Sequence, residues 1–69
     1  MIHVSKKQYD HYEITPIEFG VPYASSFLHR DALPGWIADA ISELNLLGVG
    51  YTSARYGVKV DENTWHINF

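Results

Sequence analysis

Four histidines are the side chains best suited to chemistry in this 69-residue chain. Imidazole is the only side chain whose ordinary pKa lies near neutrality. His11 follows Asp10 and precedes Glu13 by two residues, so carboxylates flank an imidazole. A zinc site needs two or three further ligands, and the chain has no His-x-x-x-His pair and no cysteine. We therefore expect no metal site and no cofactor. His3 and His66 would be neighbours if the strands predicted around them pair.

Other patterns associated with catalysis are incomplete. Asp39 and Glu43 stand four residues apart, which places them on one side of a helix, but acid–base work needs a cleft that a small domain rarely forms. No serine occupies a Gly-x-Ser-x-Gly turn, and residues 48–50 (Gly-Val-Gly) follow a predicted helix instead of opening one. Residues 29–31 (His-Arg-Asp) match a kinase triplet in letters only, because no phosphate loop accompanies them. We predict that the protein is not an enzyme.

The clearest structural signal is a helix over residues 34–47. Its apolar side chains recur at steps of three and four, the period of one helix face. They are Leu33, Trp36, Ile37, Ala40, Ile41, Leu44 and Leu47. Pro34 suits the first turn, Asp31 can accept hydrogen bonds from free first-turn amides, and Gly48 favours the left-handed conformation that ends a helix.

Alternation with period two predicts a C-terminal hairpin of strands 55–60 and 65–69. Residues 61–64 (Asp-Glu-Asn-Thr) have the composition of the turn between them. We expect the apolar side of this hairpin to pack on the helix, with 49–51 supplying a third strand. Each strand gathers its apolar residues on one face. They are Tyr56, Val58 and Val60 in the first strand, and Trp65, Ile67 and Phe69 in the second.

The first thirty residues carry weaker signals. Residues 2–4 alternate like a strand, although a capping box could open a short helix at 5–12, and 11–15 again alternate like a strand. The pattern Thr-Pro-Ile-Glu at 15–18 predicts one helical turn, and 22–29 predict a second short helix.

Two architectures follow from these elements for a single domain of residues 1–69. The first is an α+β fold in which the main helix, about 34–47, packs on a small antiparallel sheet ending in the C-terminal β-hairpin (55–60/65–69). The alternative is a winged helix-turn-helix fold. It would use short helices at 16–20 and 22–29, a third helix at 34–47, and the hairpin as its wing.

Composition and charge restrict the class of partner. An apolar content of 46% suits a packed core, and no apolar run is long enough to span a bilayer. Without cysteine or a signal-peptide pattern, the chain is expected to be cytoplasmic and to have no membrane partner. The net charge of −3 opposes phosphate binding, and the main helix has no Lys or Arg to contact DNA, so we do not expect a nucleic acid partner.

Aromatic residues remain as the functional signal. We expect Trp36, Trp65, Phe19, Phe27 and Phe69 to fill the core, while five tyrosines are more than so small a core can hide. The leading hypothesis is a protein-binding module that inhibits or regulates a larger protein or complex, of the kind that phages and mobile elements encode, and that also contacts its own copy. The predicted contact residues are Tyr51, Tyr56, Arg55 and Leu46, with Asp39 and Glu43 as an acidic rim.

Two further hypotheses stay open. A winged-helix transcription regulator would bind DNA phosphates through a dispersed basic set. This set is Lys6, Lys7, Arg30, Arg55 and Lys59. Metal binding through the histidines would require a zinc-dependent change in melting temperature, and its ligands would be His3, His11, His29 and His66.

Overall fold

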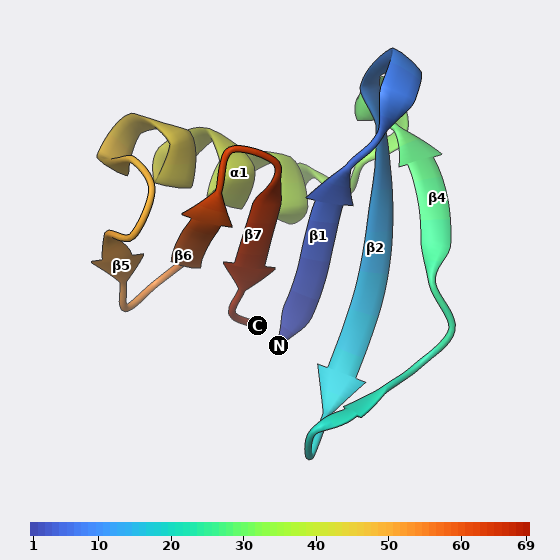
Figure 1. Cartoon of the computed structure of the whole chain (residues 1–69), viewed down its shortest axis with the longest axis horizontal. Coiled ribbons are helices and arrows are strands. Elements are labelled where there is room, and N and C mark those ends of the chain that lie inside the picture. The colour runs from blue at the N-terminus through green and yellow to red at the C-terminus, as the bar shows by residue number, and fades with distance from the viewer.

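The computed structural model describes all residues, 1–69, and contains one α-helix and seven strands (Figure 1). The strands are β1 (Ile2–Lys6), β2 (His11–Glu18), β3 (Val21–Pro22), β4 (Ser26–His29), β5 (Thr52–Ser53), β6 (Gly57–Asp61) and β7 (Thr64–Ile67). The helix is α1 (Gly35–Leu47), and two 3₁₀ turns are η1 (Gln8–Asp10) and η2 (Arg30–Ala32). The predicted α+β class, main helix and C-terminal hairpin are confirmed.

All strands belong to one antiparallel sheet in the order β3-β2-β1-β7-β6-β5, and β4 also pairs with β2. The first strand of the chain therefore lies between the second and the last. In this register Val4 lies opposite both Ile14 and Trp65, and His3 lies opposite His66. Strand β1 thus joins the N-terminal and C-terminal halves of the domain.

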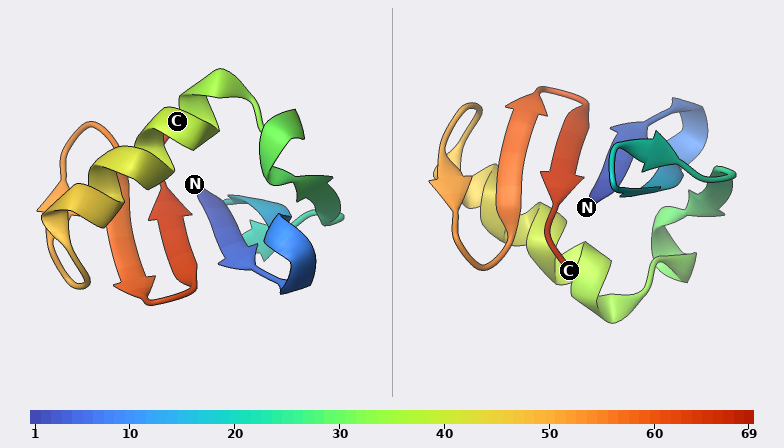
Figure 2. Two further views of the ribbon diagram at one scale, coloured as in Figure 1. Left: turned by 90° about the horizontal axis from the view of Figure 1, so that it is seen from above. Right: turned by 90° about the horizontal axis from the view of Figure 1, so that it is seen from below.

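Figure 2 shows α1 along one face of the sheet, and the buried core lies between the two. Alternate residues of β1, β2 and β7 point toward the helix because side chains in a strand alternate between its two faces. The ten buried side chains are Ile2, Val4, Tyr12, Ile14, Trp65 and Ile67 from the sheet and Ile37, Ala40, Ile41 and Leu44 from the helix. Burial of each large apolar side chain contributes roughly 1.5–3 kcal/mol, so this layer is the main source of stability.

Trp65 makes two specific contacts within this core. Its ring lies 5.9 Å from that of Tyr12, and its indole Nε1–H donates to Asn45 Oδ1 on α1 at 3.1 Å. A buried indole N–H needs such a partner, because an unpaired donor costs about 1–3 kcal/mol. This hydrogen bond fixes the helix against β7.

The hairpin of β6 and β7 corrects one part of the prediction. Val58 lies opposite His66 and Lys59 lies opposite Trp65, while a β-bulge between Lys59 and Asp61 accommodates Val60. Val58 therefore points away from the helix, and the expectation that the Val58–Val60 face packs on it is wrong. Gly57 and Lys59 take the inner face instead, and the Lys59 ammonium lies 5.5 Å from the centre of the Trp65 ring.

The hairpin turn itself follows the prediction. The Asn63 N–H donates to Asp61 Oδ1 at 2.9 Å, which holds the pKa of that carboxyl below its usual value. Residues 52–53, instead of 49–51, form the short additional strand, which pairs with β6 at the edge of the sheet.

The helical turns predicted at 15–18 and 22–29 are wrong, and strands replace them. Residues 15–18 continue β2, where the carbonyl of Pro16 accepts the Tyr23 N–H at 2.9 Å. On this side of β2, residues 11–14 pair with β4 and residues 17–18 pair with β3. Pro16 lies between these two pairings, so its missing N–H interrupts no backbone hydrogen bonds between these strands. Residues 26–29 form β4 within the predicted helix 22–29. A single α-helix excludes the winged helix-turn-helix alternative.

The ends of α1 are only partly as expected. Gly48 ends the helix with φ of +101°, as predicted. Asp31 does not cap it, because this residue lies in η2 and its N–H donates to His29 Nδ1 at 3.1 Å. The carbonyl of Pro34 accepts the first helical hydrogen bonds, from Ile37 and Ala38. The helix is 13 residues long, and no helix of this structure has the length and apolarity to cross a membrane.

Four aromatic residues expected in the core lie on the surface. They are Phe19, Phe27, Trp36 and Phe69. A single helix covers only one face of the sheet, so apolar side chains outside that layer have no second core to enter.

Gly57→Ala should strongly destabilise the domain. Gly57 has φ of +120°, and an added Cβ would lie 2.0 Å from the carbonyl oxygen of His66. We expect a loss of about 2–4 kcal/mol in the free energy of unfolding, measured by urea denaturation. Gly35→Ala is the matched control, because its Cβ meets open space and the free energy should stay equal or rise. Equal stability of Gly57→Ala and the wild type would contradict the described hairpin geometry.

Candidate functional site

A hollow of about 210 Å³ opens between the first half of α1, the loop between β5 and β6, and the C-terminal residues. Its lining consists of Trp36, Asp39, Ala40, Arg55, Tyr56 and Asn68. Three of the six predicted contact residues, Asp39, Arg55 and Tyr56, therefore converge on one site.

Hydrogen bonds hold the loop that forms one wall of this hollow. The Tyr56 N–H donates to Ser53 Oγ at 3.1 Å, and the Tyr56 carbonyl accepts the Asn68 N–H at 3.0 Å. The side-chain amide of Asn68 also donates to the Ala54 carbonyl at 3.4 Å. The loop is tied to the C-terminal segment at two points, so Arg55 is presented from a fixed backbone.

The charges at the hollow are available to a ligand. The Arg55 guanidinium lies 5.0 Å from the centre of the Tyr56 ring, a cation–π contact that restrains it without using its hydrogen-bond donors. Four ion pairs exist within 4.0 Å in the domain, and neither Arg55 nor Asp39 takes part in them. An unpaired guanidinium and an unpaired carboxylate thus border the same hollow.

An exposed ridge of α1 leads away from the hollow. Trp36, Asp39, Glu43 and Leu46 follow each other at steps of three, four and three, which places them along one side of the helix. We call these four residues the helix ridge. All four are exposed, Trp36 to 48% and Leu46 to 82%. Sequence reasoning does not identify Trp36 as a contact residue, because its position also fits the apolar period of the helix. The sheet covers only part of this apolar stripe and leaves Trp36 exposed.

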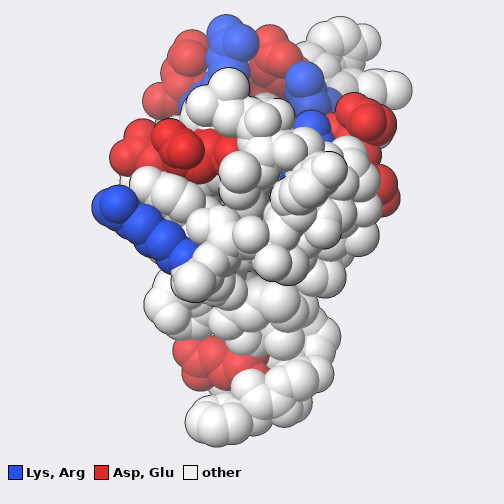
Figure 3. Space-filling view, turned by 90° about the vertical axis from the view of Figure 1, so that its left-hand side faces the viewer, with Lys and Arg blue, Asp and Glu red and all other residues white.

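The ridge ends in an apolar patch beyond the C-terminus of α1. The exposed side chains there are Leu46, Leu47, Val49 and Tyr51. The ring of Tyr51 packs beside Gly48, where it would meet an added Cβ at 3.6 Å. Figure 3 shows this end of the molecule, where most of the surface around β5 and the helix end is uncharged. Leu46 and Tyr51 therefore lie at the far end of the ridge from the hollow, with Glu43 between.

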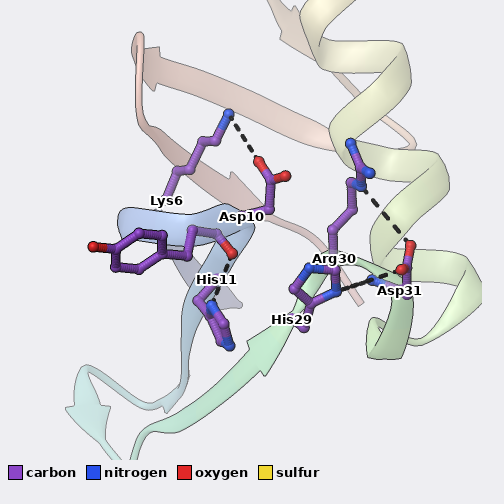
Figure 4. Close-up of polar contacts among 7 residues, drawn as sticks. Lys6, Asp10, His11, His29, Arg30 and Asp31 are labelled. Atoms are coloured by element: carbon purple, nitrogen blue, oxygen red, sulfur yellow. Dashed lines mark hydrogen bonds and ion pairs between the residues drawn. The ribbon is translucent and has the colours of Figure 1, made fainter.

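The histidines form two cross-strand pairs. His66 Nε2 and His3 Nδ1 are 3.1 Å apart on the sheet face that α1 leaves open. The strands predicted around them pair, so the two histidines are neighbours. Burial, and then the neighbouring His3, lower the pKa of His66. His11 and His29 lie edge to face with ring centres 5.3 Å apart, near the turn of Figure 4. No group of three or more His, Cys, Asp or Glu side chains is arranged to hold a metal ion.

Most of the basic side chains lie beside carboxylates. Lys6 lies 4.0 Å from Asp10, and Lys7 lies 3.6 Å from Glu13. Arg30 lies 3.9 Å from its neighbour Asp31, as Figure 4 shows together with the Lys6 pair. Three of the five basic residues are thus already beside carboxylates, an arrangement that does not favour phosphate binding.

Comparison of the chain with models of protein families, with curated proteins and with solved structures gave no match.

Acid should destabilise the domain through His66. Its pKa is lowered from 6.5 in the folded state, so the unfolded chain binds more protons as the pH falls through that value. The free energy of unfolding should therefore decrease from neutral pH until the pH lies below the lowered folded pKa. His66→Gln should remove this part of the pH dependence in denaturation series, whereas His29→Gln should keep it. An unchanged acid dependence in His66→Gln would contradict the assignment.

Proposed function

We propose that this protein is a binding module that contacts another protein through the hollow, the helix ridge and the apolar patch. The observation that carries this proposal is the gathering of Trp36, Arg55 and Tyr56 around one hollow. Tryptophan, tyrosine and arginine are the residue types that most often dominate the binding energy of protein interfaces. Arg55 and Tyr56 come from a loop held by hydrogen bonds, which lowers the entropy cost of binding.

The size of the hollow favours a protein partner over a small-molecule ligand. Its volume of about 210 Å³ is below the roughly 300–1,000 Å³ typical of small-molecule sites. It suits one side chain inserted from a partner, with the helix ridge giving further contact area.

The charges along the ridge define the partner's surface. Asp39 and Glu43 have no ion-pair partner within 4.0 Å and lie between the apolar side chains of Trp36 and Leu46. A complementary partner has an apolar groove with a basic group opposite the middle of the ridge. A small domain with such a surface and no catalytic constellation acts by occupying its partner. We therefore propose an inhibitor or regulator of a larger protein or complex, of the type that phages and mobile elements encode, acting in the cytoplasm.

Capture of the tagged protein from a lysate of its own host, with nuclease present, tests this proposal. A stoichiometric protein partner identified by mass spectrometry is the expected result. Recovery that disappears with nuclease would favour DNA binding, the alternative, and a steep loss of binding to random duplex DNA with salt would establish it.

Arg55→Ala should weaken binding to the captured partner by about thirtyfold or more, the effect of a hot spot of at least about 2 kcal/mol. Its thermal midpoint should stay near that of the wild type because the side chain is exposed. Trp36→Ala should also reduce affinity. Tyr56 is less suitable as a test, because it packs against the core.

Arg30→Ala is the matched control, since this exposed arginine lies outside the hollow, the ridge and the patch. Calorimetric titration measures all three affinities. Wild-type affinity in both Arg55→Ala and Trp36→Ala would contradict the assigned surface.

A further inference from the structure

We propose that two copies of this chain pair through their β4 strands to form a symmetric dimer with a continuous sheet. This inference goes beyond the proposed function, because it concerns the edge of the sheet opposite to β5 and the apolar patch (Figure 1). Alternate residues of an edge strand turn their backbone N–H and C=O groups away from the sheet, where a further strand can bind them.

Strand β4 lacks charge, proline and bulges, which are features that often prevent strand pairing, although it has only four residues and Pro22 lies in β3 on the same side of β2. Residues 19–28 form ten consecutive positions without charge, and residues 19–27 are all exposed. Strand β4 itself, Ser26–His29, contains no proline, lysine or bulge. Monomeric proteins commonly protect such edges with charge, proline or bulges. We name the backbone of β4, together with the exposed side chains of Phe19, Val21, Tyr23 and Phe27, the β4 edge.

The other edge of the sheet is protected in several ways. Strand β5 has only two residues, and the Gly50 N–H donates to the Lys59 carbonyl at 2.9 Å. A β-bulge lies between Lys59 and Asp61, and both side chains carry charge. A sheet that is open at one edge and closed at the other can add one neighbour and then stops growing.

Two hairpin turns flank β2, and the second of them places Phe19 at the β4 edge. Tyr9 and Asp10 have φ of +58° and +55°, and Phe19 and Gly20 have φ of +51° and +75°, as in type I′ hairpin turns. Asparagine and glycine are the residues that adopt this conformation most easily. Phe19 adopts this conformation in the turn between β2 and β3, where the pairing of Glu18 with Val21 compensates for the strain, but its side chain remains fully exposed.

A second copy is the occupant that these features favour. The edge carries no charge that would select an oppositely charged partner, and the cores of homodimer interfaces are more apolar than other interfaces. Antiparallel pairing of a strand with itself about a two-fold axis is self-complementary, and it covers both open edges at once. The hollow and the helix ridge stay free in such a dimer, so it would present two copies of the proposed binding surface.

Sedimentation equilibrium of the wild-type chain from about 1 µM to about 1 mM tests the proposal. We expect the average mass to rise from that of the 7.9 kDa monomer to twice this value. Amide hydrogen exchange should show protection at residues 26–29 that increases with concentration. A monomer over the whole range, a dimer without this protection, or open-ended assembly would each overturn the proposal.

Phe27→Lys should raise the dimer dissociation constant at least tenfold, because lysine on an edge strand opposes pairing. Leu46→Lys is the matched control, an exposed apolar side chain outside this edge, and should dimerise like the wild type. Circular dichroism checks that both variants fold, and Ser26→Lys, at another exposed position of β4, replaces Phe27→Lys if the latter does not. Wild-type dimerisation by a folded lysine variant of either residue would contradict pairing at this edge.

Discussion

The register between β1 and β7 is the constraint on which the rest of this domain depends. It places Val4 opposite Trp65 and Ile2 opposite Ile67 on the inner face, and His3 opposite His66 on the outer face. A shift of one residue would exchange the two faces of a strand and bring imidazoles into the core. The close approach of β6 at Gly57, and the hydrogen bond from Trp65 to Asn45, both fit this one register.

One helix on one sheet face leaves apolar side chains in two other places. The first is the helix ridge with the hollow and the apolar patch, where charged and aromatic groups are mixed. The second is the uncharged β4 edge, with its strained turn at Phe19. Because the β4 edge and the apolar patch beside β5 lie at opposite edges of the sheet, self-association and partner binding use different surfaces. A dimer that presents two binding surfaces would gain avidity toward a multivalent partner.

The sequence predicts the elements whose signals are long and periodic. Spacing defines α1 and Gly48 defines its end, while alternation around Trp65 and Ile67 defines the final strand. Local signals fail where strand pairing outweighs them. At 15–18 the capping pattern favours a helical turn, but it stabilises the chain less than the pairing of these residues with strands on both sides of β2. The alternation of apolar and polar residues in the sequence does not reveal the β-bulge at Val60, so it assigns Val58 to the wrong face of the sheet. The meeting of Asp39 with Arg55 and Tyr56 depends on backbone bonds to Asn68, which sequence patterns do not reveal.

The register is tested most directly by nuclear Overhauser effects in the isotope-labelled protein. The Trp65 indole protons should show effects to the Asn45 side chain, and the His66 ring should show effects to the His3 ring. These contacts would place Trp65 against the helix and His66 on the open face. Effects from His66 or Val58 to Ile41 or Leu44 would instead show the opposite register and contradict the described division of inner and outer residues.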